Sequence, residues 1–180
     1  PSTLDTQDGL NAIPLTRDVD VLSAAAREAF AKGVLPITPP VVGAIDEILR
    51  RHRIEVRGKQ VVVVGRGKLV GEPSMYWFES KGGVVSVVSP RADDLSEFTK
   101  KADIVVLGAG IPRLLIPSMI KDGVVILDAG TSESAGAIVG DADPTCAEKA
   151  SLITPVPGGI GPITVAMIFK NLFTLAGARL

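Results

Sequence analysis

With 180 residues, of which 46% are hydrophobic, the chain is long enough to bury a substantial core as one domain, or as one domain with an appendage. A net charge of −1 without a basic stripe argues against nucleic acid as a partner, and no apolar run is long enough to cross a membrane. The single cysteine, Cys146, excludes an internal disulfide and suits a reducing compartment, so we expect a cytoplasmic protein. The mean hydropathy of +0.35 is high, which hints at apolar surface covered by another subunit or domain.

The first part of the chain predicts a connector followed by two helices. Residues 1–20 show no periodicity and are expected to be extended. Residues 23–32 predict a helix with Ser23 as its N-cap and Gly33 just past its end. Thr38 is expected to cap the next helix, which runs to about Arg53. Its apolar face is formed by Val42, Ile45, Ile48 and Leu49.

From Gly58 onward, predicted strands alternate with helices. This alternation predicts an α/β fold of the Rossmann type, with a mostly parallel sheet and helices on both faces. Strands are expected at 59–65, 84–89, 103–108, 124–128 and 152–154, with an edge strand at 137–139. Helical segments are expected at 74–80, 95–101, 116–120 and 142–150, and a closing helix at 164–175. The closing helix is apolar on most of its faces, so we expect it to be buried against something beyond the sheet.

The stretch 59–73 (KQVVVVGRGKLVGEP) organises this half of the chain. Its four consecutive valines are typical of a strand buried on both faces, and a glycine turn and a helix follow. Gly65 can make the tight turn, Gly67 lets the backbone approach a pyrophosphate, and Gly71 is the third glycine. The N–H groups at the start of the helix would then face the phosphates. The alternative is an ordinary glycine turn without a ligand.

The ends of the other predicted strands favour a bound dinucleotide. Ser89 and Arg91 follow the second strand and Gly110 the third, and ligands of such sheets lie beyond the carboxyl ends of the strands. No acid stands at the end of the second strand to accept from a ribose hydroxyl. Arg66 and Arg91 would instead suit a 2′-phosphate, so we expect NADP, with NAD possible. Arg91 can also be a solvated surface charge.

Several stretches together resemble one family. In this order they are similar to the bifunctional methylenetetrahydrofolate dehydrogenase/methenyltetrahydrofolate cyclohydrolases, over the second half of the family's usual length. The stretches are DVD at 18–20, P-x-T-P at 36–39, GKQVVVVGRGKLVGEP at 58–73, ADIVV at 102–106, VVILDAG at 124–130, GD at 140–141 and TPVPGGIGPIT at 154–164. The last stretch is the most specific of them.

The resemblance implies oxidation of 5,10-methylenetetrahydrofolate by NADP, followed by hydrolysis to 10-formyltetrahydrofolate. It makes Asp20 the aspartate that contacts the pterin ring. It places Gly159, Ile160, Gly161 and Pro162 beside the folate, and Arg66 and Thr154 on the cofactor side. It also implies a homodimer.

The resemblance is incomplete. Gly67 replaces the serine of the family's G-R-S, Ser89-Pro90-Arg91-Ala92 replaces H-S-R-T, and Val21 replaces the glycine after D-V-D. The family's catalytic lysine, in a Y-x-x-x-K motif, has no counterpart, so no catalytic residue is assigned. We therefore expect 1–57 to be a connector with helices from the folate side, 58–153 the dinucleotide-binding domain, and 154–180 a folate-side loop and closing helix that belong with a missing catalytic domain.

Other residues have ordinary roles. Cys146 has no nearby histidine, and Asp141 with Asp143 makes no cation site, so no metal is expected. Two alternative functions remain: a dehydrogenase of another small substrate on the same sheet, and a nucleotide-binding module without turnover.

Overall fold

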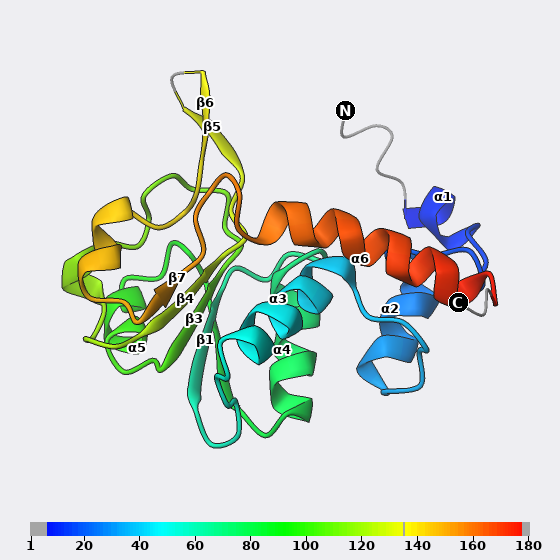
Figure 1. Ribbon diagram of the computed structural model, residues 1–180, viewed down its shortest axis with the longest axis horizontal. Helices are drawn as coiled ribbons and strands as arrows, with labels where there is room; N and C mark the ends of the chain where they lie inside the picture. Colours follow the sequence, from blue (N-terminus) through cyan, green and yellow to red (C-terminus); the bar gives the residue numbers. More distant parts are fainter. Residues whose placement is uncertain (1–6, 135, 178–180) are drawn as a thin grey trace.

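The centre of the fold is a five-stranded parallel sheet (Figure 1). The computed structural model describes residues 7–134 and 136–177. The strand order is β2-β1-β3-β4-β7. Their bounds are β1 Gln60–Val64, β2 Val84–Val88, β3 Ile104–Leu107, β4 Val125–Asp128 and β7 Leu152–Ile153. All four pairings are parallel, which confirms the predicted α/β architecture.

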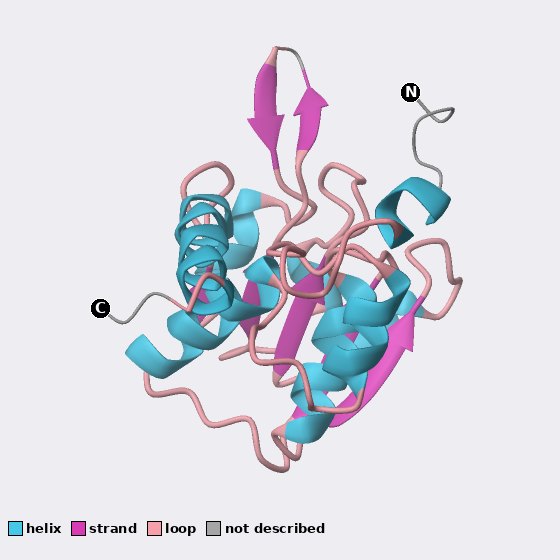
Figure 2. Cartoon of the chain, turned by 90° about the vertical axis from the view of Figure 1, so that its right-hand side faces the viewer, coloured by secondary structure: helices cyan, strands magenta, loops and turns pink. Residues whose placement is uncertain are grey.

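Helices cover both faces of this sheet, as predicted (Figures 1 and 2). The α-helices are α1 Gln7–Asn11, α2 Ala24–Ala31, α3 Pro40–Arg51, α4 Gly71–Ser80, α5 Leu95–Thr99 and α6 Ile160–Leu175. Two 3-10 helices, η1 Pro117–Met119 and η2 Pro144–Glu148, complete the connections. The two remaining strands, β5 Ser132–Ser134 and β6 Ala137–Val139, form a hairpin of their own.

The valine strand is buried because it lies inside the sheet. β1 pairs with β2 on one side and with β3 on the other, and Val61 to Val64 are all buried. Alternate valines face opposite layers. Val61 and Val63 join α3 and α4, whereas Val62 and Val64 join the layer of α5, η1 and η2. The run has no polar position because both sides of this strand are core.

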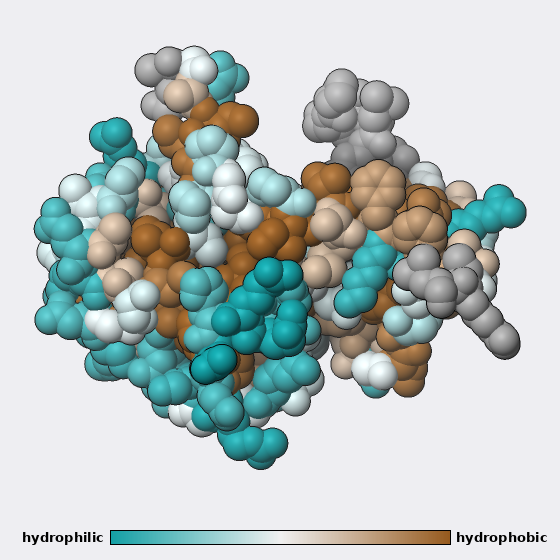
Figure 3. Space-filling model, viewed as in Figure 1, coloured by the Kyte–Doolittle hydropathy of each residue, from teal (hydrophilic) through white to brown (hydrophobic). Residues whose placement is uncertain are grey.

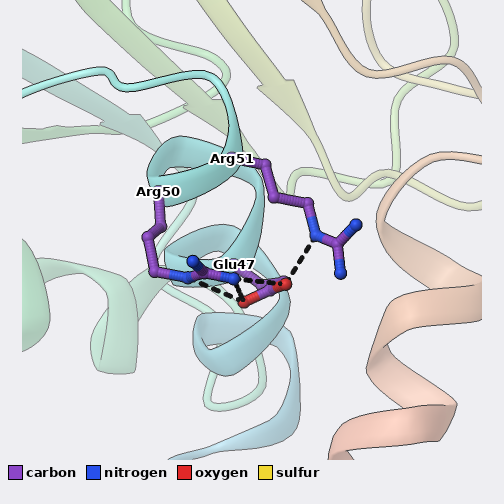
Figure 4. Close-up of polar contacts among 3 residues, drawn as sticks. All are labelled: Glu47, Arg50 and Arg51. Atoms are coloured by element: carbon purple, nitrogen blue, oxygen red, sulfur yellow. Dashed lines mark hydrogen bonds and ion pairs between the residues drawn. The ribbon is translucent and has the colours of Figure 1, made fainter.

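The layer of α3 and α4 holds the larger side chains. The predicted apolar face of α3 is buried, and Trp77 and Phe78 of α4 pack edge to face with ring centroids 4.8 Å apart. The charged end of α3 stays in solvent: Arg50 and Arg51 both pair with Glu47 (Figure 4). Exposed pairs of this kind contribute little stability, so we treat them as a solvated helix end.

Four predictions about the N-terminal part and the hairpin differ from the structure. Residues 1–6 lie outside the described residues, but 7–11 form the helix α1 rather than an extended connector. Thr38 does not cap α3: Pro39 is the N-cap, because two prolines fix the entry to the helix at Pro40. α3 ends at Arg51 rather than about Arg53, whose φ of 55° leaves the helical region. Finally, 137–139 is no edge strand of the main sheet, since it pairs antiparallel with β5 in a hairpin that projects from the body (Figure 2).

Both helices next to the predicted ligand loops begin earlier than predicted. α4 begins at Gly71 rather than after Pro73, and α6 begins at Ile160 rather than Thr164. In each case a proline lies within the first three residues of the helix, where its missing N–H costs nothing. The last residues of each predicted loop are therefore the first turn of a helix.

The helix α6 packs on α3 and leaves an apolar face exposed. A Cβ added at Gly43 of α3 would lie 3.1 Å from Cγ of Met167, so the two helices are in close contact. Asn171 is buried and donates from Nδ2 to the carbonyls of Val19 and Thr38. On another side of the helix, four large side chains are 46% to 57% exposed, namely Val165, Phe169, Leu172 and Phe173. Figure 3 shows apolar atoms along this helix. The expected burial of α6 is thus only partial in the described chain.

Within the described residues, no helix has both the length and the apolar character needed to cross a membrane.

Two buried hydroxyls provide a test of the fold. Ser74 Oγ is buried without a hydrogen-bond partner among the described residues, whereas Thr99 Oγ1 donates to the carbonyl of Met119 at 2.7 Å. We expect Ser74→Ala to leave the free energy of unfolding unchanged or raise it, because no bond is lost. Thr99→Val should lower it by about 1–2 kcal/mol, because a buried carbonyl loses its donor. Urea unfolding of both variants checks this, and an equal loss would contradict it.

Candidate functional site

The glycine turn after β1 is held by close contacts between backbones. Gly65 has a φ of 99°, and a Cβ added there would lie 2.8 Å from the carbonyl oxygen of Gly108. A Cβ added at Gly71 would lie 2.1 Å from the carbonyl oxygen of Gly65. Neither contact can be relieved by a side-chain rotation, since the obstructing atom is backbone. These two glycines therefore let the turn, the end of β3 and the start of α4 lie against one another.

A cleft lies directly over this turn, at the carboxyl ends of β1, β3 and β4. It is lined by residues 67–70, 108–110 and 129–131. A Cβ added at Gly67 or Gly110 would meet no atom within 4 Å, so the backbone at both positions is open to the cleft. Open backbone beside a phosphate-sized space suits a dinucleotide, which needs close approach of N–H groups to its pyrophosphate.

The start of α4 contributes less to this cleft than the sequence predicts. The N–H of Glu72 already donates to the carbonyl of Gly67 at 3.0 Å, and Pro73 has no N–H. Neither Glu72 nor Pro73 therefore offers a free N–H to a ligand in the cleft.

Three predicted cofactor residues, Arg66, Ser89 and Arg91, lie at two neighbouring strand ends. Gly65 donates its N–H to the carbonyl of Val88 at 2.9 Å, which places the turn with Arg66 beside the end of β2. Ser89 and Arg91 follow β2 and are exposed, and the N–H of Arg91 lies 3.3 Å from Oγ of Ser89. Arg66 is exposed as well. Both arginines are therefore accessible from solvent, and neither of them lines the cleft over the glycine turn.

The predicted folate loop lines a second, larger cleft. Gly159, Ile160, Gly161 and Pro162 all line it, and residues 128–131 at the end of β4 form another part of its wall. A Cβ added at Gly159 would lie 2.5 Å from the carbonyl oxygen of Pro155, so this loop depends on a glycine to fold back before α6. Residues 129–131 line both clefts, so the folate loop and the cleft over the glycine turn share one strand end.

Thr154 has a different position from the rest of the loop. It is buried, and its Oγ1 accepts the N–H of Asp128 at 2.7 Å. The side chain thus joins β7 to the end of β4. Thr154 lines neither the cleft over the glycine turn nor the cleft at the folate loop.

Asp20 lines a third cleft, between α2, α3, α4 and α6. Val41, Leu69 and Thr164 line both this cleft and the one at the folate loop, so the two are adjacent. Burial raises the pKa of the half-buried Asp20 carboxyl, and the nearby Asp18 raises it further. Asp18 itself accepts the N–H groups of Leu22 and Ser23, at 2.9 and 2.8 Å, which holds the turn that carries Asp20.

Leu69 and Val41 belong to this region although sequence reasoning passed over them. Leu69 is exposed and lines all three clefts, because it lies in the glycine turn at the point where they meet. The sequence signal that could have indicated Leu69 is the presence of a large apolar residue in the glycine turn. Val41 has no such signal, since it looks like any apolar helix position.

Among residues 7–134 and 136–177, no group of three or more His, Cys, Asp or Glu side chains is placed to hold a metal ion. Cys146 is buried, and burial raises the pKa of its thiol to about 11, so it is not a ready nucleophile.

Comparison with known proteins identifies the fold and the family. The model of the tetrahydrofolate dehydrogenase/cyclohydrolase NAD(P)-binding domain matches residues 36–180. The chain belongs to this family. It is 40% identical over 167 residues to the bifunctional protein FolD of Thermomicrobium roseum, and 37% identical over 173 residues to FolD of Clostridium perfringens. The expected α/β dinucleotide-binding fold and the suspected family are both confirmed.

Solved structures agree with this assignment. The crystal structure of FolD from Campylobacter jejuni matches with a TM-score of 0.92 and 34% identity, over 97% of this chain and 63% of that one. The Trypanosoma brucei enzyme, solved with NADP and an inhibitor, matches with a TM-score of 0.92 and 33% identity, over 100% of this chain and 65% of that one. The match to the C. perfringens protein covers 96% of this chain but 62% of that protein, and the match to the T. roseum protein covers 92% of this chain but 57% of that protein.

The raised pKa of Asp20 gives a prediction with a definite sign. A carboxyl with a raised pKa binds its proton more tightly when folded, so its charge lowers stability at neutral pH and this cost disappears as the pH falls through the raised pKa. Asp20→Asn should therefore raise the free energy of unfolding at pH 7, and the gain should vanish in acid.

Asp103 is the matched control, because Lys121 lowers the pKa of its carboxyl. Asp103→Asn should lower stability at pH 7, and that difference should shrink as the pH falls. Denaturant unfolding at pH 7 and at the lowest pH where the chain stays folded measures both. The same sign for the two variants would contradict the assignment.

Proposed function

We propose that this chain is the nucleotide-binding part of an enzyme that oxidises 5,10-methylenetetrahydrofolate with NADP and hydrolyses the methenyl product to 10-formyltetrahydrofolate. The proposal rests chiefly on one observation. We call the cleft lined by residues 67–70, 108–110 and 129–131 the nucleotide cleft, and the cleft lined by residues 159–162 the folate-loop cleft. Both are lined by residues 129–131, so two ligands bound in them would meet at the end of β4.

Each part of the site has a task in this reaction. The nicotinamide, when bound, accepts a hydride from the folate. The protein has to hold the two ring systems in contact and exclude water from between them. The turn 67–70 would hold the pyrophosphate, and residues 159–162 would form the wall beside the folate. Asp20 would accept hydrogen bonds from the amino and N–H donors of the pterin ring.

The hydrolysis step needs a group that this chain does not supply at an assigned position. A water must be activated near the methenyl carbon, and a lysine with a lowered pKa can move the proton. The relatives are longer than this chain, and their additional residues would carry this lysine. The exposed apolar face of α6, with Phe169 and Phe173, would then be covered by that catalytic domain in the whole protein.

A homodimer in the cytoplasm completes the proposal. It draws on the family and on the high mean hydropathy of the chain. Light scattering of the whole protein tests it, and a clean monomer would remove the dimer from the proposal.

The preference for NADP depends on Arg66 and Arg91. A relative solved with NADP supports it, and both arginines are exposed at neighbouring strand ends. Loss of a charge-assisted contact to a 2′-phosphate costs about 1–2 kcal/mol at such a site, which is roughly a 5- to 30-fold increase in Kd. Arg66→Ala and Arg91→Ala should each weaken NADP to this extent and leave NAD unchanged.

Arg57→Ala is the control, because Arg57 is exposed and precedes β1 at the opposite end of the sheet. It should alter neither Kd. Calorimetric titration of the three variants and the unmodified chain with both nucleotides gives the Kd values. Equal weakening of NADP and NAD would mean that the arginines do not recognise the 2′-phosphate.

The proposed reaction is tested by following nicotinamide reduction with 5,10-methylenetetrahydrofolate. NADP and NAD are assayed in parallel, with this chain and with any longer native form. We expect turnover with NADP by the longer form. Saturable nucleotide binding without turnover by either form would overturn the dehydrogenase proposal and leave a nucleotide-binding module.

A further inference from the structure

A buried carboxylate binds the backbone of the loop after β3. Asp141 is fully buried, and its two carboxylate oxygens accept three consecutive backbone N–H groups. The donors are Ala109 at 2.7 Å, Gly110 at 3.1 Å and Ile111 at 2.8 Å. Ala109 and Gly110 line the nucleotide cleft, whereas Asp141 does not. The carboxylate thus acts on this wall of the cleft without being part of it.

A second buried carboxylate continues the same connection. Asp128 ends β4, and its carboxylate accepts the N–H groups of Gly130 at 2.9 Å, Asp141 at 3.2 Å and Ala142 at 2.8 Å. Its own N–H donates to Oγ1 of Thr154. Gly130 also lines the nucleotide cleft. Asp128 therefore ties the second wall of the cleft to the backbone of the residue that ties the first.

Two glycines make this arrangement possible, because there is no room for a Cβ beside either carboxylate. A Cβ added at Gly130 would lie 2.3 Å from Cγ of Asp141, and one added at Gly140 would lie 2.2 Å from Oδ2 of Asp128. The Asp141 carboxylate thus lies against the backbone of loop 129–131, and the Asp128 carboxylate lies against the backbone at Gly140. β3 and β4 pair as far as Leu107 and Asp128, and the N–H of Ala129 donates to the carbonyl of Leu107 at 2.9 Å. Beyond that bond, the two carboxylates connect the loops.

We propose that Asp141 and Asp128 are positioning residues for the nucleotide: together they fix the distance between loop 108–111 and loop 129–131, the two walls between which it binds. The inference rests on the proposed nucleotide binding. It adds a role for two buried acids, of which Asp141 lines neither cleft and Asp128 lines only the folate-loop cleft.

The side-chain chemistry explains why the carboxylate is needed. A carboxylate only accepts, and can satisfy three N–H groups at once. An asparagine at 141 has one accepting oxygen and one donating NH₂ group, which would face an N–H donor on one side of the loop. Asp141→Asn keeps the shape of the side chain but removes at least one of the three bonds, so loop 108–111 should loosen while the core stays folded.

The decisive comparison is Asp141→Asn against Asp103→Asn. Asp103 precedes β3, at the other end of the strand, and accepts the N–H of Gln60 at 2.8 Å far from the cleft. Both variants lose a carboxylate bonded to backbone, so both should lose stability. Only Asp141→Asn should raise the Kd for NADP, by at least about tenfold, with Asp103→Asn within twofold of the unmodified chain. Similar Kd values for the two variants would overturn the inference.

Amide hydrogen exchange adds a measurement that general destabilisation would not reproduce. Without nucleotide, the amides of Ala109, Gly110 and Ile111 should be protected in the unmodified chain and exchange at least tenfold faster in Asp141→Asn. In Asp103→Asn they should keep their protection relative to the core strands. Protection that is unchanged in Asp141→Asn would also overturn the inference.

Two further arms separate this inference from the proposed function. If the unmodified chain binds neither NADP nor NAD, the proposed function fails for this chain, and the exchange rates still decide whether Asp141 holds the loop. If Asp141→Asn does not fold, Gly130→Ala displaces the Asp141 carboxylate through a 2.3 Å contact. This variant should raise the NADP Kd in the same way, and an unaltered Kd would count against the positioning role.

Discussion

The close approach of Gly71 to Gly65 is the contact on which the arrangement of the site depends. With 2.1 Å between the carbonyl oxygen of Gly65 and a Cβ placed on Gly71, only glycine lets α4 begin directly against the turn after β1. The end of β3 is drawn into the same contact, because Gly65 also lies against Gly108. The cleft above the turn exists because these three backbone segments meet without side chains between them. A larger residue at either position would push the helix away from the sheet and separate the walls of the cleft.

The core could be predicted from the sequence because its signals are strong and local. Four successive valines have one structural explanation, a strand covered on both faces, and the structure places them between β2 and β3 with helices on either side. The helix boundaries were less accessible. Prolines at the first turn of α3, α4 and α6 can stand either before a helix or inside its first turn, and the sequence around Pro73 and Pro162 does not distinguish the two. The hairpin β5–β6 was missed as a hairpin because a strand of three residues is too short to show an alternation that would assign it to one sheet or another.

The site divides in the same way. Glycines at strand ends indicate a ligand, since a missing side chain is visible in the sequence. The residues that hold those glycines in place cannot be recognised in the same way, because the sequence does not distinguish an aspartate that accepts loop N–H groups from an aspartate in solvent. In the sequence, Asp128 and Asp141 stand only inside two of the stretches that resemble the family, VVILDAG and GD, whereas in the structure both are buried and each accepts three N–H groups. Burial raises the pKa of the Asp128 carboxyl, and the three N–H groups that it accepts, from Gly130, Asp141 and Ala142, act in the opposite direction.

Val21 shows how far a local departure from the family can be accommodated. It has a φ of 59° and is buried, at the position where the family carries glycine. A β-branched residue in the left-handed region costs about 1–2 kcal/mol. The position is nevertheless determined by its surroundings: Asp18 holds the backbone on its C-terminal side, and the valine side chain packs with Ala26 and Ile37. Burial of an apolar side chain recovers an amount of similar size. The turn can therefore keep the geometry that a glycine would give it, and Asp20 lines the cleft between α2, α3, α4 and α6.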